Sequence, residues 1–244
     1  MTDFVNLWIY LSATPLFGLT LTLAVYALAQ AGAQRLQYAP WANPVLASVL
    51  VLAGVLTLTD TPYPRYFSGA QFIHFLLGPA VVALAWPLWE RRALLRRHWR
   101  VLLVAALLGG GVASVSAVAL AWLLGMPWDV ALALAPKSVT APVAMGIADK
   151  IGGVAALAAV FAVITGMVGA LSAKPLFGWM GIPTDAPGWM ARGFALGTAS
   201  HGIGAARALQ VNPEAGALAG LALGVQAILA TLILPTVVGF LRQL

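Results

Sequence analysis

Residues 135–146, APKSVTAPVAMG, place a lysine between two prolines in a chain that is otherwise strongly apolar. Lys137 lies well inside an apolar run, where a lysine facing lipid costs about 2.5–3.5 kcal/mol. Pro136 and Pro142 each remove a backbone donor and disfavour helix at the preceding residue. Unwound backbone at membrane depth is tolerated only where it is buried in protein or lines a watery cavity. This stretch therefore predicts an interrupted membrane segment.

The hydroxyl residues Ser138 and Thr140 give the same segment a chemistry. Their side chains can satisfy carbonyl groups that the break leaves free, or they can bind a ligand. An amine beside hydroxyls and a helix terminus suits a carboxylate, so we expect Lys137, Ser138 and Thr140 to bind substrate. The alternative interpretation places Lys137 near a membrane interface, with prolines that only kink a span.

A second irregular segment, GTASHGIGAARA, covers residues 197–208. It combines three glycines with three polar residues: Gly197, Gly202, Gly204, Thr198, Ser200 and His201. Glycines permit close backbone approach and non-helical dihedral angles, and the polar side chains are predicted to bind substrate. His201 can also change charge near neutral pH, which makes it the candidate for proton coupling. Alternatively, the small residues only pack helices tightly, and His201 bonds to a neighbour.

Weaker signals stand outside these two segments. Gly78 and Pro79 predict a further break within a span, which would line the same cavity. Arg207, Asp149 and Asn43 are possible secondary contacts for an anion or a proton, although each also suits the end of a helix.

The composition restricts the protein to the membrane. The 244 residues are 61% hydrophobic and 8% charged, against roughly 25% charged in a soluble domain. The net charge of +6 lies in short loops, where the positive-inside rule explains it without nucleic acid. The chain has no cysteine and no Walker, HExxH or GxSxG motif. We therefore expect no catalytic residue, metal site, cofactor or enzyme activity.

The apolar runs predict an all-α polytopic membrane protein with about seven or eight transmembrane segments. The fifth and seventh segments are the interrupted or re-entrant ones. We expect one transmembrane domain, 1–244, in which N-terminal spans occupy 1–100 and a repeat-containing core occupies 101–244. The predicted segments are Phe4–Ala29, Pro44–Thr59, Phe72–Trp89, Val101–Leu124, Val130–Ala148, Val154–Ala173, Met190–Leu209 and Gly216–Phe240.

Orientation follows from residues 90–100, ERRALLRRHWR, which carry five arginines between two spans. Such a short basic loop is expected on the cytoplasmic side of the bacterial inner membrane. If all eight segments cross fully, Lys150 and Arg207 lie on the cytoplasmic side as well.

An internal repeat relates the two irregular segments. LLGMPW at 123–128 resembles WMGIPT at 179–184, and each follows a glycine-rich span and precedes one irregular segment. Paired interrupted segments in two halves are a sequence pointer to a transporter's binding site. Span counting makes the repeat parallel, whereas a re-entrant segment would make it inverted, and the sequence leaves both open.

The stretches APKSVTAPVAMGIADKIGG, GTASHGIGAARALQ and FLLGPAVVALAWPLW closely resemble the LrgB/CidB family, from about Asn43 to Phe240. Ala141 stands where the family often has threonine, and Gly202 where alanine is common. The resemblance implies two alternatives. One is a holin/antiholin-like regulator of murein hydrolases and lysis, acting with a small LrgA/CidA-type membrane partner. The other is a carboxylate carrier, as for relatives that resemble plastid glycolate/glycerate translocators or are implicated in pyruvate uptake.

We favour a secondary transporter of small monocarboxylates, of the glycolate, glycerate, lactate or pyruvate type, coupled to protons or another cation. A holin needs no lysine beside two interrupted helices. The expected partners are the carboxylate, the bilayer, an LrgA/CidA-type protein and further copies of the chain. The stripe Gly216, Gly220 and Gly224 is predicted to pack helices.

Overall fold

The computed structural model describes residues 16–37, 39, 42, 44–76, 79, 82, 83, 85–90 and 92–243. Every regular element in this part of the chain is an α-helix. Four helices are long and apolar enough to cross a membrane: α2 (Leu16–Arg35), α7 (Arg92–Leu123), α10 (Ala155–Trp179) and α12 (Pro213–Leu241). The prediction of an all-α polytopic membrane protein is confirmed, and the number of spans stays a prediction.

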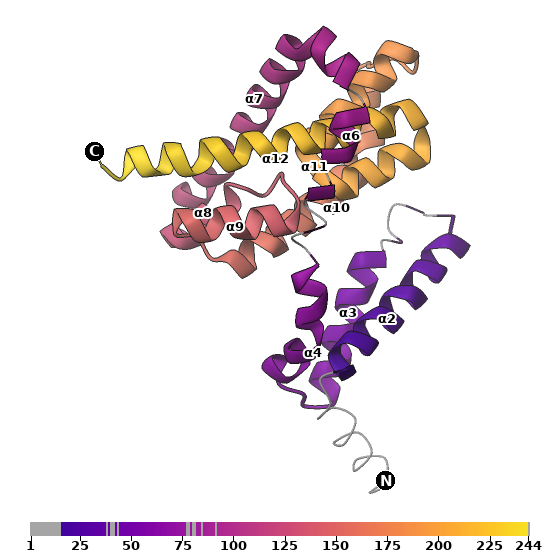
Figure 1. Cartoon of the computed structure of the whole chain (residues 1–244), viewed down its shortest axis with the longest axis vertical. Helices are drawn as coiled ribbons and strands as arrows, with labels where there is room; N and C mark the ends of the chain where they lie inside the picture. Colours follow the sequence, from indigo (N-terminus) through magenta and orange to yellow (C-terminus); the bar gives the residue numbers. More distant parts are fainter. Residues whose placement is uncertain are drawn as a thin grey trace, which may run out of the picture. The chain divides into compact units, whose positions relative to one another are not determined.

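Residues 1–79 and 80–244 form two compact units. In the first, α2 packs against both α3 (Pro44–Leu58) and α4 (Tyr63–Phe75) (Figure 1). Gly18 of α2 lies directly against the backbone of Tyr66, and the Thr22 hydroxyl lies 2.7 Å from the Tyr66 hydroxyl. The division of the chain near residue 100 stays a prediction.

The basic segment was expected as a loop, and this expectation is wrong in its conformation. After α6 (Ala85–Glu90), residues 92–100 are the first turns of α7, which bends at His98 (φ −117°, ψ 15°). Arginine, leucine and alanine are strong helix formers, so a basic segment of this composition is helical. Arg92 also stacks on the Trp89 ring at 4.6 Å.

The first irregular segment is a helical hairpin. It consists of α8 (Trp128–Leu134), a turn at residues 135–140, and α9 (Ala141–Ile151). The two ends meet, because the N–H of Val154 donates to the carbonyl of Asp129 at 3.3 Å. Pro142 sits in the first turn of α9, where its missing N–H costs nothing. We call residues 128–151 the first hairpin and residues 135–140 its tip.

The second irregular segment, α11 (Ala186–Val211), also folds back on itself. His201 has φ 42° and ψ −133°, which breaks the helix into two arms. A methyl group at Gly204 would lie 2.7 Å from the carbonyl oxygen of Leu196, whereas eight residues of straight helix span about 12 Å. The chain therefore reverses at His201. We call residues 186–211 the second hairpin and His201 its tip.

The repeat seen in the sequence recurs in the structure. Gly125 (φ 73°) ends α7 and Gly181 (φ 66°) ends α10. Each is followed by an N–H that bonds to the carbonyl five residues before it: Met126 to Ala121 and Ile182 to Phe177. This is the Schellman ending, in which glycine supplies the left-handed residue. Both halves thus read as a long helix, a glycine turn and a hairpin.

Helices α7 and α12 run parallel to each other. Ala106 and Ala222 share one buried cluster, and Gly110 lies against Gln226. Farther along both helices, Val118 and Leu234 pack against a second buried cluster. Figure 1 shows that α12 runs across the second compact unit, residues 80–244, from the second hairpin to the first.

The other contacts show that the repeat is inverted. The first arm of α11 runs parallel to α12, because Gly193 lies against Ala215 and Gly197 against Ala219. The same arm runs antiparallel to α10: His201 bonds to Ala162 near the start of α10, and Leu196 packs with Phe177 near its end. It follows that α10 runs antiparallel to α7.

Candidate functional site

Both hairpin tips reach the same stretch of α7. The Ser114 hydroxyl donates to the carbonyl of Ala135 in the first tip at 2.7 Å. A methyl group at Gly109 would lie 3.3 Å from Cγ2 of Thr198, one turn before the second tip. Five helical residues span about 7.5 Å. The two interrupted segments, far apart in the sequence, therefore converge near the middle of one helix.

Helix α10 joins the tips from another side. The Nε2 atom of His201 lies 2.7 Å from the carbonyl oxygen of Ala162. Ala162 belongs to the same buried cluster as Ala135 and Val139 of the first tip. His201 is only 4% exposed, and its ring also lies against Gly166 of α10.

In the first tip, the side chain of Lys137 is partly exposed, whereas the neighbouring hydroxyl of Ser138 is buried. Lys137 is half-buried, and among the described residues its ammonium group has neither a hydrogen bond nor an ion pair. Ser138 is buried and Thr140 half-buried, while Pro136 is almost fully covered. The turn thus holds an unneutralised charge beside buried backbone.

Three predicted substrate-binding hydroxyls share one property. The side-chain oxygens of Ser138, Thr198 and Ser200 are buried without a hydrogen-bond partner in the described part of the chain. Buried polar atoms in proteins almost always have a partner, and an orphan calls for an explanation. Together with the Lys137 charge, these hydroxyls make the tips suited to a small polar anion. No contact joins Lys137 directly to the second hairpin within the described residues.

The predicted glycine breaks need correction. Gly197, Gly202 and Gly204 lie within the helical arms, and the non-helical dihedral angles belong to His201. Gly197 and Gly204 serve packing, because a methyl group there would overlap the backbone of Ala219 or Leu196. Gly202 faces open space.

The secondary contacts are not gathered at the tips. Asp149 is exposed in the last turn of α9, and Arg207 lies in the returning arm of α11, 3.4 Å from the Gln210 side-chain oxygen. Pro79 is helical and exposed. Asn43 and Gly78 lie outside the described residues. Within the described residues, no three histidine, aspartate or glutamate side chains cluster as metal ligands.

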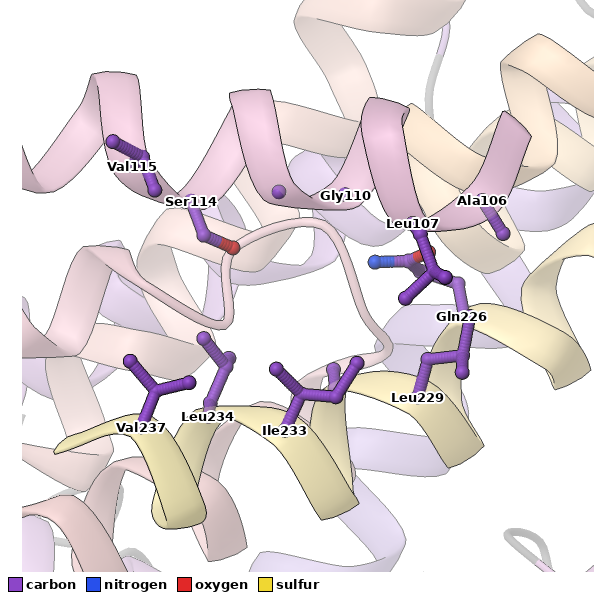
Figure 2. Close-up of a pocket in the computed structure, with 12 residues that line it drawn as sticks. Ala106, Leu107, Gly110, Ser114, Val115, Gln226, Leu229, Ile233, Leu234 and Val237 are labelled. Carbon is purple, nitrogen blue, oxygen red and sulfur yellow. The ribbon is translucent and has the colours of Figure 1, made fainter. Parts of the chain in front are cut away.

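Sequence reasoning missed the α7–α12 side of the site. A cavity of about 160 Å³ lies between these helices, with Gln226 at one end and Ser114 at the other (Figure 2). Gln226 is 5% exposed, and its side-chain oxygen has no partner among the described residues. The available signals were the Gly109–Gly111 run and a single amide within a long apolar span.

Comparisons with known proteins agree with the sequence resemblance. Residues 22–240 match the model of the LrgB-like family. "Uncharacterized protein YxaC" of Bacillus subtilis is 33% identical over 89% of this chain and 93% of its own length. A Haemophilus influenzae protein is 31% identical over 80% and 83%. "Holin-like protein CidB" of Staphylococcus aureus is 26% identical over 89% and 93%. No solved structure matches the chain significantly.

Proposed function

The chain belongs to the LrgB-like family, and from that premise we propose that it is a secondary transporter of small monocarboxylates. The observation that carries the proposal is the convergence of two inverted hairpins on α7, where Ser114 bonds to the first hairpin and Gly109 lies against Thr198 of the second. Discontinuous helices that meet near the midplane are how many inverted-repeat transporters build a substrate site. A plain anchor or packing helix has no need of such turns.

In this proposal Lys137 neutralises the carboxylate. Its charge has no partner among the described residues, so an incoming anion meets a cation that does not first have to break an ion pair. The hydroxyls of Ser138, Thr198 and Ser200, which are buried and unpartnered, donate to the oxygens of the acid. Such hydrogen bonds to a charged acceptor are worth about 1.5–3 kcal/mol each. Thr140 adds a hydroxyl at the start of α9, and His201 couples a proton.

The test is uptake of radiolabelled glycolate, lactate and pyruvate into proteoliposomes, with and without a pH gradient. We expect saturable uptake by the wild type and a loss of at least about tenfold in Lys137→Ala, with partial rescue by Lys137→Arg. Lys150→Ala is the matched control, because Lys150 is exposed at the end of α9. Equal uptake by Lys137→Ala and the wild type would remove the anion role of Lys137.

A second candidate is a holin/antiholin-like regulator that acts with an LrgA/CidA-type partner. The names of the CidB relatives favour it over the carrier. It expects the stripe Gly216, Gly220 and Gly224 to matter more than Lys137. Gly216, however, packs against Leu209 of the neighbouring arm, so its substitution disturbs this chain itself.

Dye release separates the two candidates. A holin-like protein releases trapped dyes without regard to their chemistry, whereas a carrier keeps vesicles sealed and moves acids saturably and stereoselectively. Leakage of an uncharged dye that is unaffected by Lys137→Ala, with no acid uptake even with a co-reconstituted partner, would establish the second candidate.

A further inference from the structure

Gln226 lies near the middle of the long apolar helix α12, where a polar side chain needs a reason. Its amide lies directly against Gly110 of α7, and a methyl group at that position would overlap the amide. The glutamine is therefore covered by α7 of its own chain and is not presented to another protein. At 5% exposure its side-chain oxygen has no donor among the described residues.

The space beside this amide is small and largely apolar. The cavity of about 160 Å³ falls below the roughly 300–1,000 Å³ of sites for drug-sized ligands. Figure 2 shows Gln226 and Ser114 at opposite ends, with aliphatic side chains of α12 such as Leu229, Ile233 and Leu234 between them.

The cavity, which is lined by α7 and α12, is adjacent to the hairpin tips. Ser114 lines it and donates to Ala135 of the first tip, so the ribbon that reaches the Ser114 hydroxyl in Figure 2 is the α8–α9 turn. Gly109, which meets Thr198 near the second tip, directly precedes Gly110. A molecule held by its carboxylate at the tips therefore has this cavity next to it.

We propose that the α7–α12 cavity is the subsite for the rest of the substrate, and that the Gln226 side-chain oxygen accepts a hydrogen bond from its 2-hydroxyl group. The inference rests on the proposed transport of monocarboxylates and narrows it to small 2-hydroxy acids. A hydroxyl supplies the missing donor to the amide oxygen. The keto oxygen of a 2-oxo acid is only an acceptor, and the amide nitrogen that could donate to it lies against Gly110. The aliphatic wall takes the carbon chain.

The experiment compares lactate with pyruvate, which share a carbon skeleton and differ at the 2-position. Uptake and equilibrium binding of both labelled acids are measured for the wild type, Gln226→Leu, Gly110→Ala and Gly178→Ala. Gly110→Ala displaces the amide without removing it. Gly178→Ala is its control, because Gly178 is an exposed glycine of α10 that lies outside the cavity lining and has nothing near it.

We expect the wild type to prefer lactate. Gln226→Leu should lower kcat/KM for lactate about tenfold or more and leave pyruvate within about threefold, because only the hydroxyl loses its partner. Gly110→Ala should follow the same pattern, and Gly178→Ala should match the wild type. Retained pyruvate uptake shows that the variants fold.

The failures are distinguishable. An unchanged lactate-to-pyruvate ratio in Gln226→Leu, with both acids still carried, overturns the role of Gln226 and leaves transport standing. Lactate binding that depends on Gln226 without any uptake supports the subsite and overturns the transport function. If the wild type neither binds nor carries either acid, both the subsite and the transport function are overturned.

Discussion

The ring of His201 is tied to the carbonyl of Ala162 by a 2.7 Å contact at Nε2, and the same histidine carries the dihedral angles that reverse α11. One residue thus forms the turn and attaches it to α10. Glycine is the usual residue at a positive φ, so a histidine at this position strains the backbone. Its contact with α10 explains why the tip lies where it does.

The first prediction separates the backbone of His201 from its side chain. His201→Ala and His201→Gly both lose the contact with Ala162, but only glycine adopts φ 42° and ψ −133° without strain. Strain of this kind costs of order 1–3 kcal/mol, partly offset by the entropy of glycine in the unfolded chain. We expect His201→Gly to be more stable than His201→Ala by about 1 kcal/mol, measured by thermal unfolding in detergent. Both should lose proton-dependent uptake, and an equally stable pair would contradict the turn at this residue.

The second prediction concerns two glycines on either side of that turn. A methyl group at Gly197 overlaps the backbone of Ala219, whereas Gly202 faces open space. We expect Gly197→Ala to destabilise the chain by about 1–3 kcal/mol through overpacking. Gly202→Ala should be neutral or stabilising by up to about 1 kcal/mol, as alanine favours helix. The same unfolding assay compares them, and equal melting temperatures would speak against the parallel packing of α11 on α12.

The third prediction concerns the C-terminal end of α12. The Arg242 guanidinium donates to the carbonyl of Ile151 at 2.6 Å, beside the left-handed Gly152 that ends α9. Arg242→Ala should cost about 1 kcal/mol of unfolding free energy, since a C-terminal carbonyl loses a charged donor. Arg207→Ala is the control, because the one hydrogen bond of its side chain within the described residues is the 3.4 Å contact with Gln210. It should change stability by less than about 0.5 kcal/mol. Equal effects would show that the bond contributes nothing.

The sequence predicted the class and both irregular segments because apolar length, proline and buried charge are local properties. Lys137 between two prolines and His201 among glycines mark their breaks without any knowledge of packing. Gln226 could not be found in this way, since its meaning depends on Gly110, which belongs to another helix and shows only in the fold. The direction of the repeat was equally hidden, because a hairpin and a kinked span have the same composition.

The last prediction tests that direction. The chain has no cysteine, so single cysteines can be placed at Met126, Lys150, Met180 and Glu214 and labelled with an impermeant maleimide in intact and permeabilised cells. Each hairpin returns to the side that it enters from. Met126→Cys and Lys150→Cys should therefore label from one face of the membrane, and Met180→Cys and Glu214→Cys should label from the other face. Full crossings would instead place Met126 and Lys150 on different faces.

The same labels also report the absolute orientation. If residues 90–100 are cytoplasmic, α7 carries the Met126 and Lys150 pair to the outside. Eight full crossings would instead place Lys150 on the cytoplasmic side. Labelling of that pair from opposite faces would refute the re-entrant first hairpin and, with it, the inverted repeat on which the proposed site depends.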